Sequence, residues 1–168
     1  MSQNLYLPAH QFLDEHMIPY LKQTFASETE KGAANVARVL GYSERQMVKT
    51  LIFVTSADEK VLVMLGGDQN AVSGHLKKAI GSRNIKLAPP DIVQATTGYR
   101  IGSIPPFHWQ PADFRSFLDT ALMQEPLLGV GAGVWGQEIM ITPSDLVAAT
   151  QAKVANLCEK SQPVFETL

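Results

Sequence analysis

The chain has 168 residues, of which 45% are hydrophobic and 18% are charged, and its net charge at pH 7 is -2. This length and composition are typical of one globular domain with a sizeable core. The weak negative charge argues against a protein that holds nucleic acid mainly by electrostatic attraction. The single cysteine, Cys158, excludes an internal disulfide and a cysteine-based metal cluster.

The sequence contains no apolar run that approaches the ~18 residues that a membrane-spanning helix needs. The first residues, Met1 to Pro8, lack the basic region and apolar core of a secretory signal. We therefore expect a cytoplasmic protein.

Helical patterns dominate the N-terminal quarter of the chain. Residues 8–24 predict one or two short helices, interrupted by Pro19, and the segment 20–26 is expected to be extended. Apolar side chains at positions i, i+3, i+4 and i+7 predict a helix over 32–40. Gly41 is expected to end that helix, because glycine adopts the left-handed conformation of a helix C-terminus at little cost.

A β-hairpin is predicted next. Residues 48–54 are rich in β-branched and aromatic side chains, and 60–65 reads as the partner strand. A helix over 73–80 follows. Gly66-Gly67, between strand and helix, is similar to a phosphate-binding turn, but no Gly-x-Gly-x-x-Gly or Walker pattern is present. A plain connection is the preferred interpretation.

The second half of the chain mixes short strands and helices. A strand is predicted over 84–87, a helix over 89–97, a strand edge over 107–109 and a helix over 111–125. The remaining predicted elements are a strand over 127–130, a return strand over 138–142 and a last helix over 143–158. Because strands occur both in hairpins and in strand–helix–strand units, we predict a mixed α/β fold in a single domain.

A stretch rich in glycine and proline, Gly98-Tyr-Arg-Ile-Gly-Ser-Ile-Pro-Pro-Phe107, separates two of these elements. Its prolines fix φ and remove two N–H donors, so the remaining N–H groups near 102–104 are expected to point in one direction. Such a loop can hold a carbonyl, a carboxylate or a phosphate; the alternative is a rigid connector. The segment 77–100, which leads into this stretch, carries a net charge of +4. This charge either binds a phosphate or belongs to a solvated helix face.

Few side chains suggest conventional catalysis. Lys49 begins a predicted strand, where a lysine lies either at the solvent-exposed end or in a site that needs a positive charge. The sequence offers no Ser/His/Asp spacing and no paired histidines, so we expect no metal and no cofactor. Cys158 is interpreted as a small core residue.

Several short motifs occur in an order similar to that of one known family. They are Val48-Lys-Thr-Leu51, a hairpin ending in Gly67-Asp68, Lys77-Lys78, Leu87-Ala-Pro-Pro-Asp91, Thr97-Gly-Tyr99, Gly102-Ser-Ile-Pro-Pro-Phe107, Gly131-Ala-Gly-Val-Trp-Gly136 with Glu138, and Thr142-Pro-Ser-Asp-Leu146. Over residues 25–157 the chain resembles the YbaK/ProX family of aminoacyl-tRNA editing domains. That family is related to the insertion domain of bacterial prolyl-tRNA synthetase.

The resemblance implies a curved, partly barrel-like mixed β-sheet surrounded by helices. It divides the chain into an N-terminal helical extension over 1–24, an editing domain over 25–157 and a C-terminal tail over 158–168. It also implies a trans-editing hydrolase that deacylates mischarged tRNA. The implied partners are the acceptor end of that tRNA and, as a candidate, prolyl-tRNA synthetase.

The resemblance assigns site residues one by one. Lys49 matches the family's near-invariant lysine and is the expected catalytic residue, supplying positive charge for the terminal nucleotide and the developing oxyanion. A water, or a group of the substrate, attacks while the loop N–H groups hold the carbonyl. The expected substrate-binding residues are Thr50, Gly102, Ser103, Ile104, Pro105, Pro106, Gly131 and Glu138. His108 is either a general base or a surface residue beside Trp109.

Two departures bear on the substrate. Relatives that edit cysteine carry serine at the position of Gly131 and aspartate at that of Glu138. The loop is closer to that of relatives that clear alanine, so we expect Ala-tRNA(Pro), otherwise a Cys- or Ser-charged tRNA. The alternatives are a non-catalytic tRNA- or nucleotide-binding module of the same fold, or an enzyme for another activated acyl or phosphoryl substrate. The pocket wall contributed by 20–34 is not placed.

Overall fold

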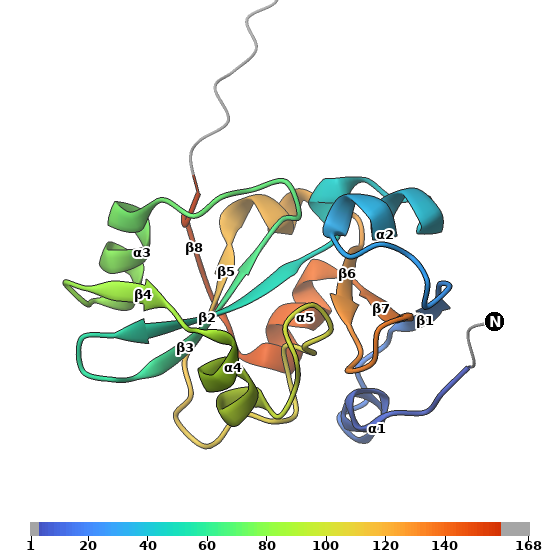
Figure 1. The fold of residues 1–168 in the computed structure, drawn as a ribbon, viewed down its shortest axis with the longest axis horizontal. Coiled ribbons are helices and arrows are strands. Elements are labelled where there is room, and N and C mark those ends of the chain that lie inside the picture. The colour runs from blue at the N-terminus through green and yellow to red at the C-terminus, as the bar shows by residue number, and fades with distance from the viewer. Residues whose placement is uncertain (1–3, 159–168) are drawn as a thin grey trace, which may run out of the picture.

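The computed structural model describes residues 4–158, which form five α-helices, two 3-10 helices and eight strands (Figure 1). The α-helices are α1 (Pro8–Glu15), α2 (Ala33–Leu40), α3 (Ser73–Ile80), α4 (Pro90–Thr97) and α5 (Pro143–Thr150). The strands are β1 (Leu21–Thr24), β2 (Lys49–Thr55), β3 (Lys60–Leu65), β4 (Ile85–Leu87), β5 (Ser116–Asp119), β6 (Leu128–Gly131), β7 (Gln137–Ile141) and β8 (Lys153–Ala155). The 3-10 helices are η1 (Glu44–Gln46) and η2 (Thr120–Gln124).

The strands form two sheets. The first has the order β1-β7-β6 and is antiparallel; the second has the order β4-β2-β3-β5-β8, with parallel pairing of β5 to β3 and β8. The sheets meet just before β2, where the Val48 N–H donates to the Gly129 carbonyl at 2.8 Å. The predicted mixed α/β single domain is confirmed, whereas the barrel-like closure of one sheet is not confirmed.

Strand β2 separates two cores, because alternate side chains of a strand point to opposite faces. Ile52 belongs to the larger core, which lies between the two sheets and includes Phe107 and Leu118. Leu51 and Phe53 pack on the other face, in the smaller core beneath α3. The hairpin of β2 and β3 forms as predicted, with Lys49 opposite Leu65.

Helix α2 covers the region where the two sheets meet. Its buried side chains, Val36 and Ala37, pack on Phe25, Met47 and Met140 in a third core. The apolar spacing predicted this helix, and Gly41 ends it with φ at 82° as expected. This position makes α2 one wall of the site described below.

The helix predicted over 111–125 is wrong. Residues 116–119 form β5, which is buried along its whole length between β3 and β8. Phe117 and Leu118 face different cores, so their apolar pattern reflects a strand buried on both faces. The helical spacing was misleading because two adjacent apolar residues fit a helix and a strand buried on both faces equally well.

Two other expectations also need correction. Residues 107–109 form no strand: Phe107 is fully buried and His108 has a φ of 78°. The last helix ends at Thr150, not at 158, because Gln151 turns left-handed and β8 then pairs with β5. The pairing partner lies over thirty residues away, which a local pattern cannot reveal.

The C-terminal end of the described chain is held in the fold. Cys158 is buried in the smaller core, as predicted, and burial raises the pKa of its thiol to about 12. The remainder of the expected tail, 159–168, lies outside the described residues. None of the helices within 4–158 is long and apolar enough to cross a membrane.

Candidate active site

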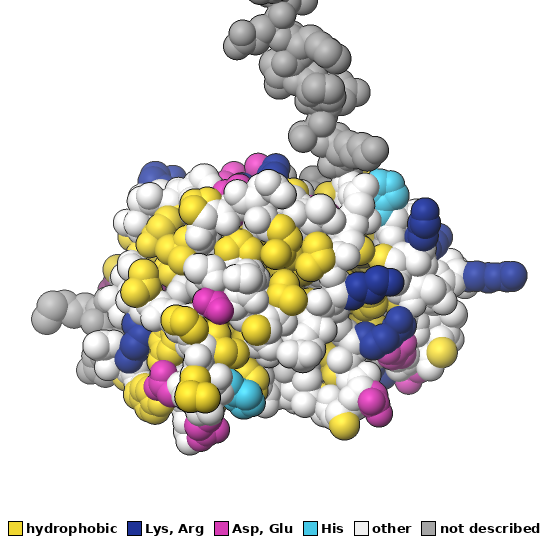
Figure 2. Space-filling model, turned by 180° about the vertical axis from the view of Figure 1, so that it is seen from behind, with side chains coloured by type: hydrophobic (Ala, Val, Ile, Leu, Met, Phe, Trp, Pro, Cys, Tyr) yellow, Lys and Arg dark blue, Asp and Glu magenta, His cyan; other side chains and the backbone are white. Residues whose placement is uncertain are grey.

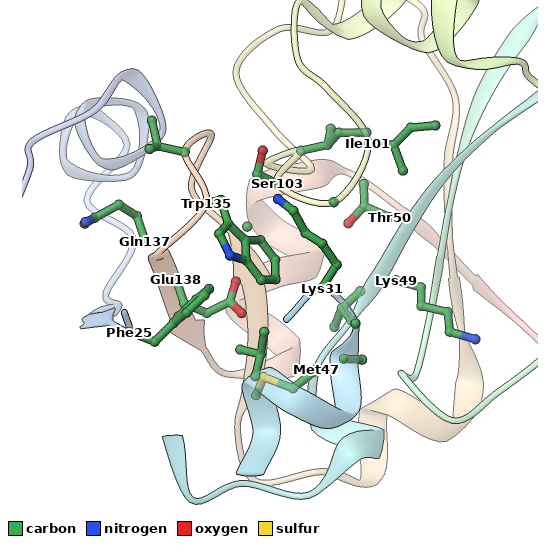
Figure 3. A pocket seen from close by; sticks show the side chains of 18 of the residues that line it. Phe25, Lys31, Met47, Lys49, Thr50, Ile101, Ser103, Trp135, Gln137 and Glu138 are labelled. Atoms are coloured by element: carbon green, nitrogen blue, oxygen red, sulfur yellow. The ribbon is translucent and has the colours of Figure 1, made fainter. Parts of the chain in front are cut away.

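A pocket of about 190 Å³ opens between α2, the start of β2, the loop before Pro105 and the hairpin of β6 and β7 (Figure 3). It brings together most of the residues that the resemblance singled out. Those that line it are Lys49, Thr50, Gly102, Ser103, Ile104, Gly131 and Glu138. Pro105 and Pro106 do not line the pocket; both are buried behind the loop.

The loop is held from behind by side chains that follow it in sequence. The Trp109 Nε1–H donates to the Pro105 carbonyl at 2.5 Å, and the Gln110 side chain donates to the Pro106 carbonyl at 2.6 Å. Ile104 is 3% exposed and anchors the loop in the main core. The prolines and these contacts restrict the loop to one conformation, as the sequence indicated.

Two residues of the loop that line the pocket have unpaired N–H groups. Within 4–158, no acceptor pairs with the N–H of Gly102 or of Ile104. Gly102 has a φ of 106°, a conformation that favours glycine. The Ser103 carbonyl accepts a hydrogen bond from the Gly133 N–H at 2.8 Å, which fixes the loop on the opposite hairpin. Because both residues line the pocket, these two N–H groups are candidates to donate to a ligand.

Gly131 permits this contact between loop and hairpin. A Cβ at this position would lie 2.7 Å from the Ser103 carbonyl carbon and 2.8 Å from its oxygen. Real Cβ atoms essentially never approach backbone so closely, so any larger residue would displace the loop. Gly131 thus sets the distance between loop and hairpin.

Glu138 lies opposite Gly131 in the pairing of β6 and β7. It is 8% exposed, and its carboxyl points into the pocket near Met47 (Figure 3). Burial raises the pKa of this carboxyl well above its usual range, since a desolvated carboxylate is costly. None of the residues 4–158 forms a hydrogen bond or ion pair with it.

Lys49 and Thr50 point to opposite faces of β2. Figure 3 shows Thr50 beside the pocket, whereas the Lys49 side chain runs away from the other labelled residues. The Lys49 Nζ donates to the Gln69 carbonyl at 2.8 Å. The Gln69 side chain in turn donates to Asp119 at 3.1 Å. In this conformation the Lys49 amine belongs to a network on the far face of β2.

The segment 20–34 supplies a wall that sequence reasoning did not place. Phe25 meets Trp135 edge-on with 4.9 Å between ring centroids, and the Trp135 Nε1–H donates to the Thr29 carbonyl at 3.1 Å. The Lys31 Nζ lies 4.0 Å from the centre of the Trp135 ring, at the rim of the pocket. An aromatic residue within the glycine-rich turn was the sequence feature that could have indicated Trp135.

His108 does not line the pocket. Its Nε2 pairs with the Tyr99 hydroxyl at 2.5 Å, and burial lowers the pKa of the imidazole. The ring therefore supports the loop from outside, and the structure gives it no access to the pocket as a general base. Among residues 4–158, no group of three or more His, Cys, Asp or Glu side chains is arranged to hold a metal ion.

The comparisons with known proteins agree with this architecture. The sequence pattern of the aminoacyl-tRNA editing domain matches residues 27–149, so the chain belongs to that family, as predicted. Editing by such a domain is hydrolysis of an aminoacyl ester, which confirms the predicted enzyme class, a deacylase.

Two relatives and one solved structure show the extent of the similarity. The chain is 28% identical over 153 residues to EbsC of Enterococcus faecalis, named as a candidate Cys-tRNA(Pro)/Cys-tRNA(Cys) deacylase (90% of this chain, 93% of the relative). It is 27% identical over 131 residues to the multifunctional Ser/Thr-tRNA deacylase ProXp-y of Escherichia coli (72% and 74%). A crystal structure described as a candidate trans-editing enzyme for prolyl tRNA synthetase superposes with a TM-score of 0.80 at 25% identity (94% and 100%).

Proposed function

We propose that this protein hydrolyses the ester between a wrong amino acid and the terminal ribose of proline tRNA. The observation that carries the proposal is the pair of unpaired N–H groups, on Gly102 and Ile104, at the edge of a small pocket in a chain of this family. In this proposal the two groups donate to the ester carbonyl, on whose oxygen negative charge develops when water adds.

The reaction needs little help beyond this arrangement. The oxygen of a water molecule bonds to the ester carbonyl carbon, and the bond between that carbon and the ribose oxygen breaks. The ribose oxygen takes up a proton, which leaves a free amino acid and an uncharged tRNA. Because the ester is already activated, positioning and electrostatic stabilisation can supply the rate enhancement. Pro105 and Pro106 contribute by keeping the loop stiff, and Thr50 faces the substrate.

Lys49 remains the candidate for the required positive charge. Its amine is bound to the Gln69 carbonyl, so direct contact with substrate needs the amine to leave that acceptor. A lysine that only fixes the start of β2 would act by positioning Thr50. The two roles differ in whether activity is lost while the variant is still folded, which gives the variant below a second readout.

Alanine is the proposed amino acid. Gly131 lets the loop approach the hairpin closely, and the pocket of about 190 Å³ is further limited by Met47 and Phe25. A small side chain suits this space better than a large one. Cysteine and serine, which differ from alanine by one atom, are the other candidates, since a single group changes pocket binding by only ~1–3 kcal/mol.

The proposed partner is the acceptor end of the tRNA. On the face shown in Figure 2, several lysine and arginine side chains gather at the right beside acidic ones, and the others lie apart at the left. With a net charge of -2, the protein is suited to few phosphate contacts, and a synthetase could supply specificity for the tRNA. Prolyl-tRNA synthetase is the candidate for that role.

A deacylation panel tests the proposal. Proline tRNA charged with alanine, cysteine, serine or proline is incubated with the wild-type protein, with Lys49→Met and with the matched control Lys60→Met. We expect loss of Ala-tRNA(Pro), no loss of Pro-tRNA(Pro), at least a tenfold slower reaction for Lys49→Met (about 1.4 kcal/mol) and no change for Lys60→Met. Lys60 begins the neighbouring strand but does not line this pocket.

The same variants distinguish the roles of Lys49. Because the amine binds the Gln69 carbonyl, Lys49→Met is expected to lower the denaturant midpoint in either case. If the amine contacts substrate, activity is lost even under conditions in which the variant is fully folded. If it only fixes β2, activity and stability fall together. A wild-type protein that hydrolyses none of the four charged tRNAs would refute the proposed function.

A further inference from the structure

Glu138 is a buried ionisable group that the proposed reaction does not use. It is more than nine-tenths buried, points into the pocket and has no hydrogen-bonding or ionic partner within 4–158. Buried carboxyls are normally hydrogen-bonded or ion-paired, because an unpaired one loses its hydrogen bonds to water and gains none in return. An unpaired carboxyl that faces an open cavity is therefore suited to receive a polar group of a ligand.

The position of Glu138 indicates which group that is. Its Cα lies opposite Gly131, and the backbone of Ser103 rests on Gly131. The carboxyl is thus next to the loop on which the ester carbonyl is proposed to bind. In an aminoacyl ester, the α-amino group is attached to the carbon adjacent to that carbonyl. A carboxyl on the neighbouring strand is well placed to meet it.

The surroundings support the same assignment. The side chains nearest the floor of the pocket, Phe25, Val36 and Met47, are apolar and at most 4% exposed, so they suit the substrate's side chain but not an amine. Two lysines also line the pocket, and both have the same sign as an ammonium. Lys31 lies at the exposed rim, and the Lys49 amine is bound to the Gln69 carbonyl on the far face of β2. A protonated carboxyl and an uncharged amine together carry the same number of protons as a carboxylate and an ammonium. The Glu138 carboxyl and the α-amino group can therefore pair without adding a net charge to the pocket.

We propose that the Glu138 carboxyl binds the α-amino group of the aminoacyl ester, so that the site requires this amine and rejects the corresponding α-hydroxy acid. The inference rests on the proposed function, since it takes an aminoacyl ester as the ligand. It adds a substrate requirement that hydrolysis of an activated ester would not by itself impose.

Binding of stable analogues tests this inference separately from turnover. Calorimetry compares 3′-deoxy-3′-(L-alanylamido)adenosine with its L-lactylamido counterpart, in which a hydroxyl replaces the amine. The wild-type protein is expected to bind the alanyl compound about 30-fold more tightly, the range of a charge-assisted hydrogen bond in a desolvated site. Glu138→Gln is expected to reduce the preference to less than about threefold. Glu30→Gln removes an exposed carboxylate beside the pocket and is expected to keep the preference.

A second readout is the rate of hydrolysis of alanyl-tRNA(Pro) and of lactyl-tRNA(Pro), each divided by the rate of spontaneous hydrolysis of the same ester. This ratio is expected to show the same preference for the amine and the same effect of Glu138→Gln. Equal binding of the two analogues by the wild-type protein, or no binding of either, would overturn the inference. A preserved preference in a folded Glu138→Gln protein would overturn it too. A binding preference for the amine without hydrolysis of any charged tRNA would support the inference and refute only the proposed function.

Discussion

The molecule contains two buried carboxyls whose surroundings differ completely. Asp119, at the end of β5, is 2% exposed and accepts three hydrogen bonds, from the Gln69 side chain at 3.1 Å, the Ala121 N–H at 3.0 Å and the Leu157 N–H at 2.8 Å. Glu138, on β7, is almost as deeply buried and accepts none from residues 4–158.

This difference distinguishes Asp119, a structural carboxyl, from Glu138, a carboxyl that is open to a ligand. Asp119 ties together η2, the 66–69 turn and the chain after β8, so its charge is fully used inside the fold. Glu138 is paired through its backbone with Gln23 and Gly131 on the neighbouring strands, and burial of its carboxyl without a partner within 4–158 is unfavourable. Unsatisfied buried groups of this kind are uncommon and concentrate at functional sites.

The largest expected effect is on Asp119. The change Asp119→Asn keeps the shape but presents an NH₂ group to at least one of the three donors. We expect the free energy of unfolding at pH 7 to fall by about 3 kcal/mol, because a buried donor is left unpaired and a charge-assisted bond is lost. Glu138→Gln is the matched control: the same exchange of acid for amide breaks no hydrogen bond within 4–158 and should not lower the free energy of unfolding. Urea unfolding measures both, and equal losses would contradict the comparison.

The loop above Glu138 gives the next largest effect. Gly131→Ala places a Cβ against the Ser103 backbone and should move the loop without touching either carboxyl. We expect kcat/KM for the edited tRNA to fall by about 100-fold, since displacement of a positioning group by ~1 Å can cost that much. A steady-state deacylation assay measures it.

Gly74→Ala is the control for this substitution. A Cβ at Gly74, in α3, meets nothing within 4 Å, so activity should be unchanged and stability slightly raised. Wild-type activity in Gly131→Ala would show that the contact between loop and hairpin does not set the geometry of the site.

The smallest expected effect is the pH dependence of stability. The pKa of Glu138 is raised in the folded protein by desolvation, so the folded state retains its proton above the pH at which the unfolded chain loses it. Stability is therefore highest below the unfolded pKa and declines as pH rises towards the folded pKa, by at most about 1.4 kcal/mol per pH unit. Glu138→Gln should remove this decline, so the variant gains on the wild type between pH 5 and pH 8. Parallel denaturant midpoints across that range would contradict the assignment.

Local patterns predicted the elements whose burial is decided nearby. The stripe of Ala33, Val36, Ala37 and Leu40 gave α2, and the β-branched run at Lys49–Thr55 gave one strand of a hairpin. Residues 111–125 failed because β5 is buried between two strands that come from elsewhere in the chain. The spacing of the apolar residues in β5 does not indicate that the strand is buried on both faces.

The stiffness of the loop over 102–106 could also be predicted from the local sequence. Glycine and two prolines restrict the backbone wherever they occur, so stiffness and unpaired N–H groups over 102–104 could be predicted. The contact between Lys31 and Trp135 could not be predicted, because these residues meet only when segments about a hundred residues apart come together, as in the bond from Trp135 to Thr29.

The sequence by itself determined the family, the mixed α/β class and seven of the residues that line the pocket, since each depends on residue types in a short, ordered pattern. The tertiary structure alone decided that Lys49 turns to the far face of β2, that Gly131 carries the loop and that Glu138 has no partner while Asp119 has three. Solvation and hydrogen bonding depend on what distant segments place around a group, and only the folded chain contains that information.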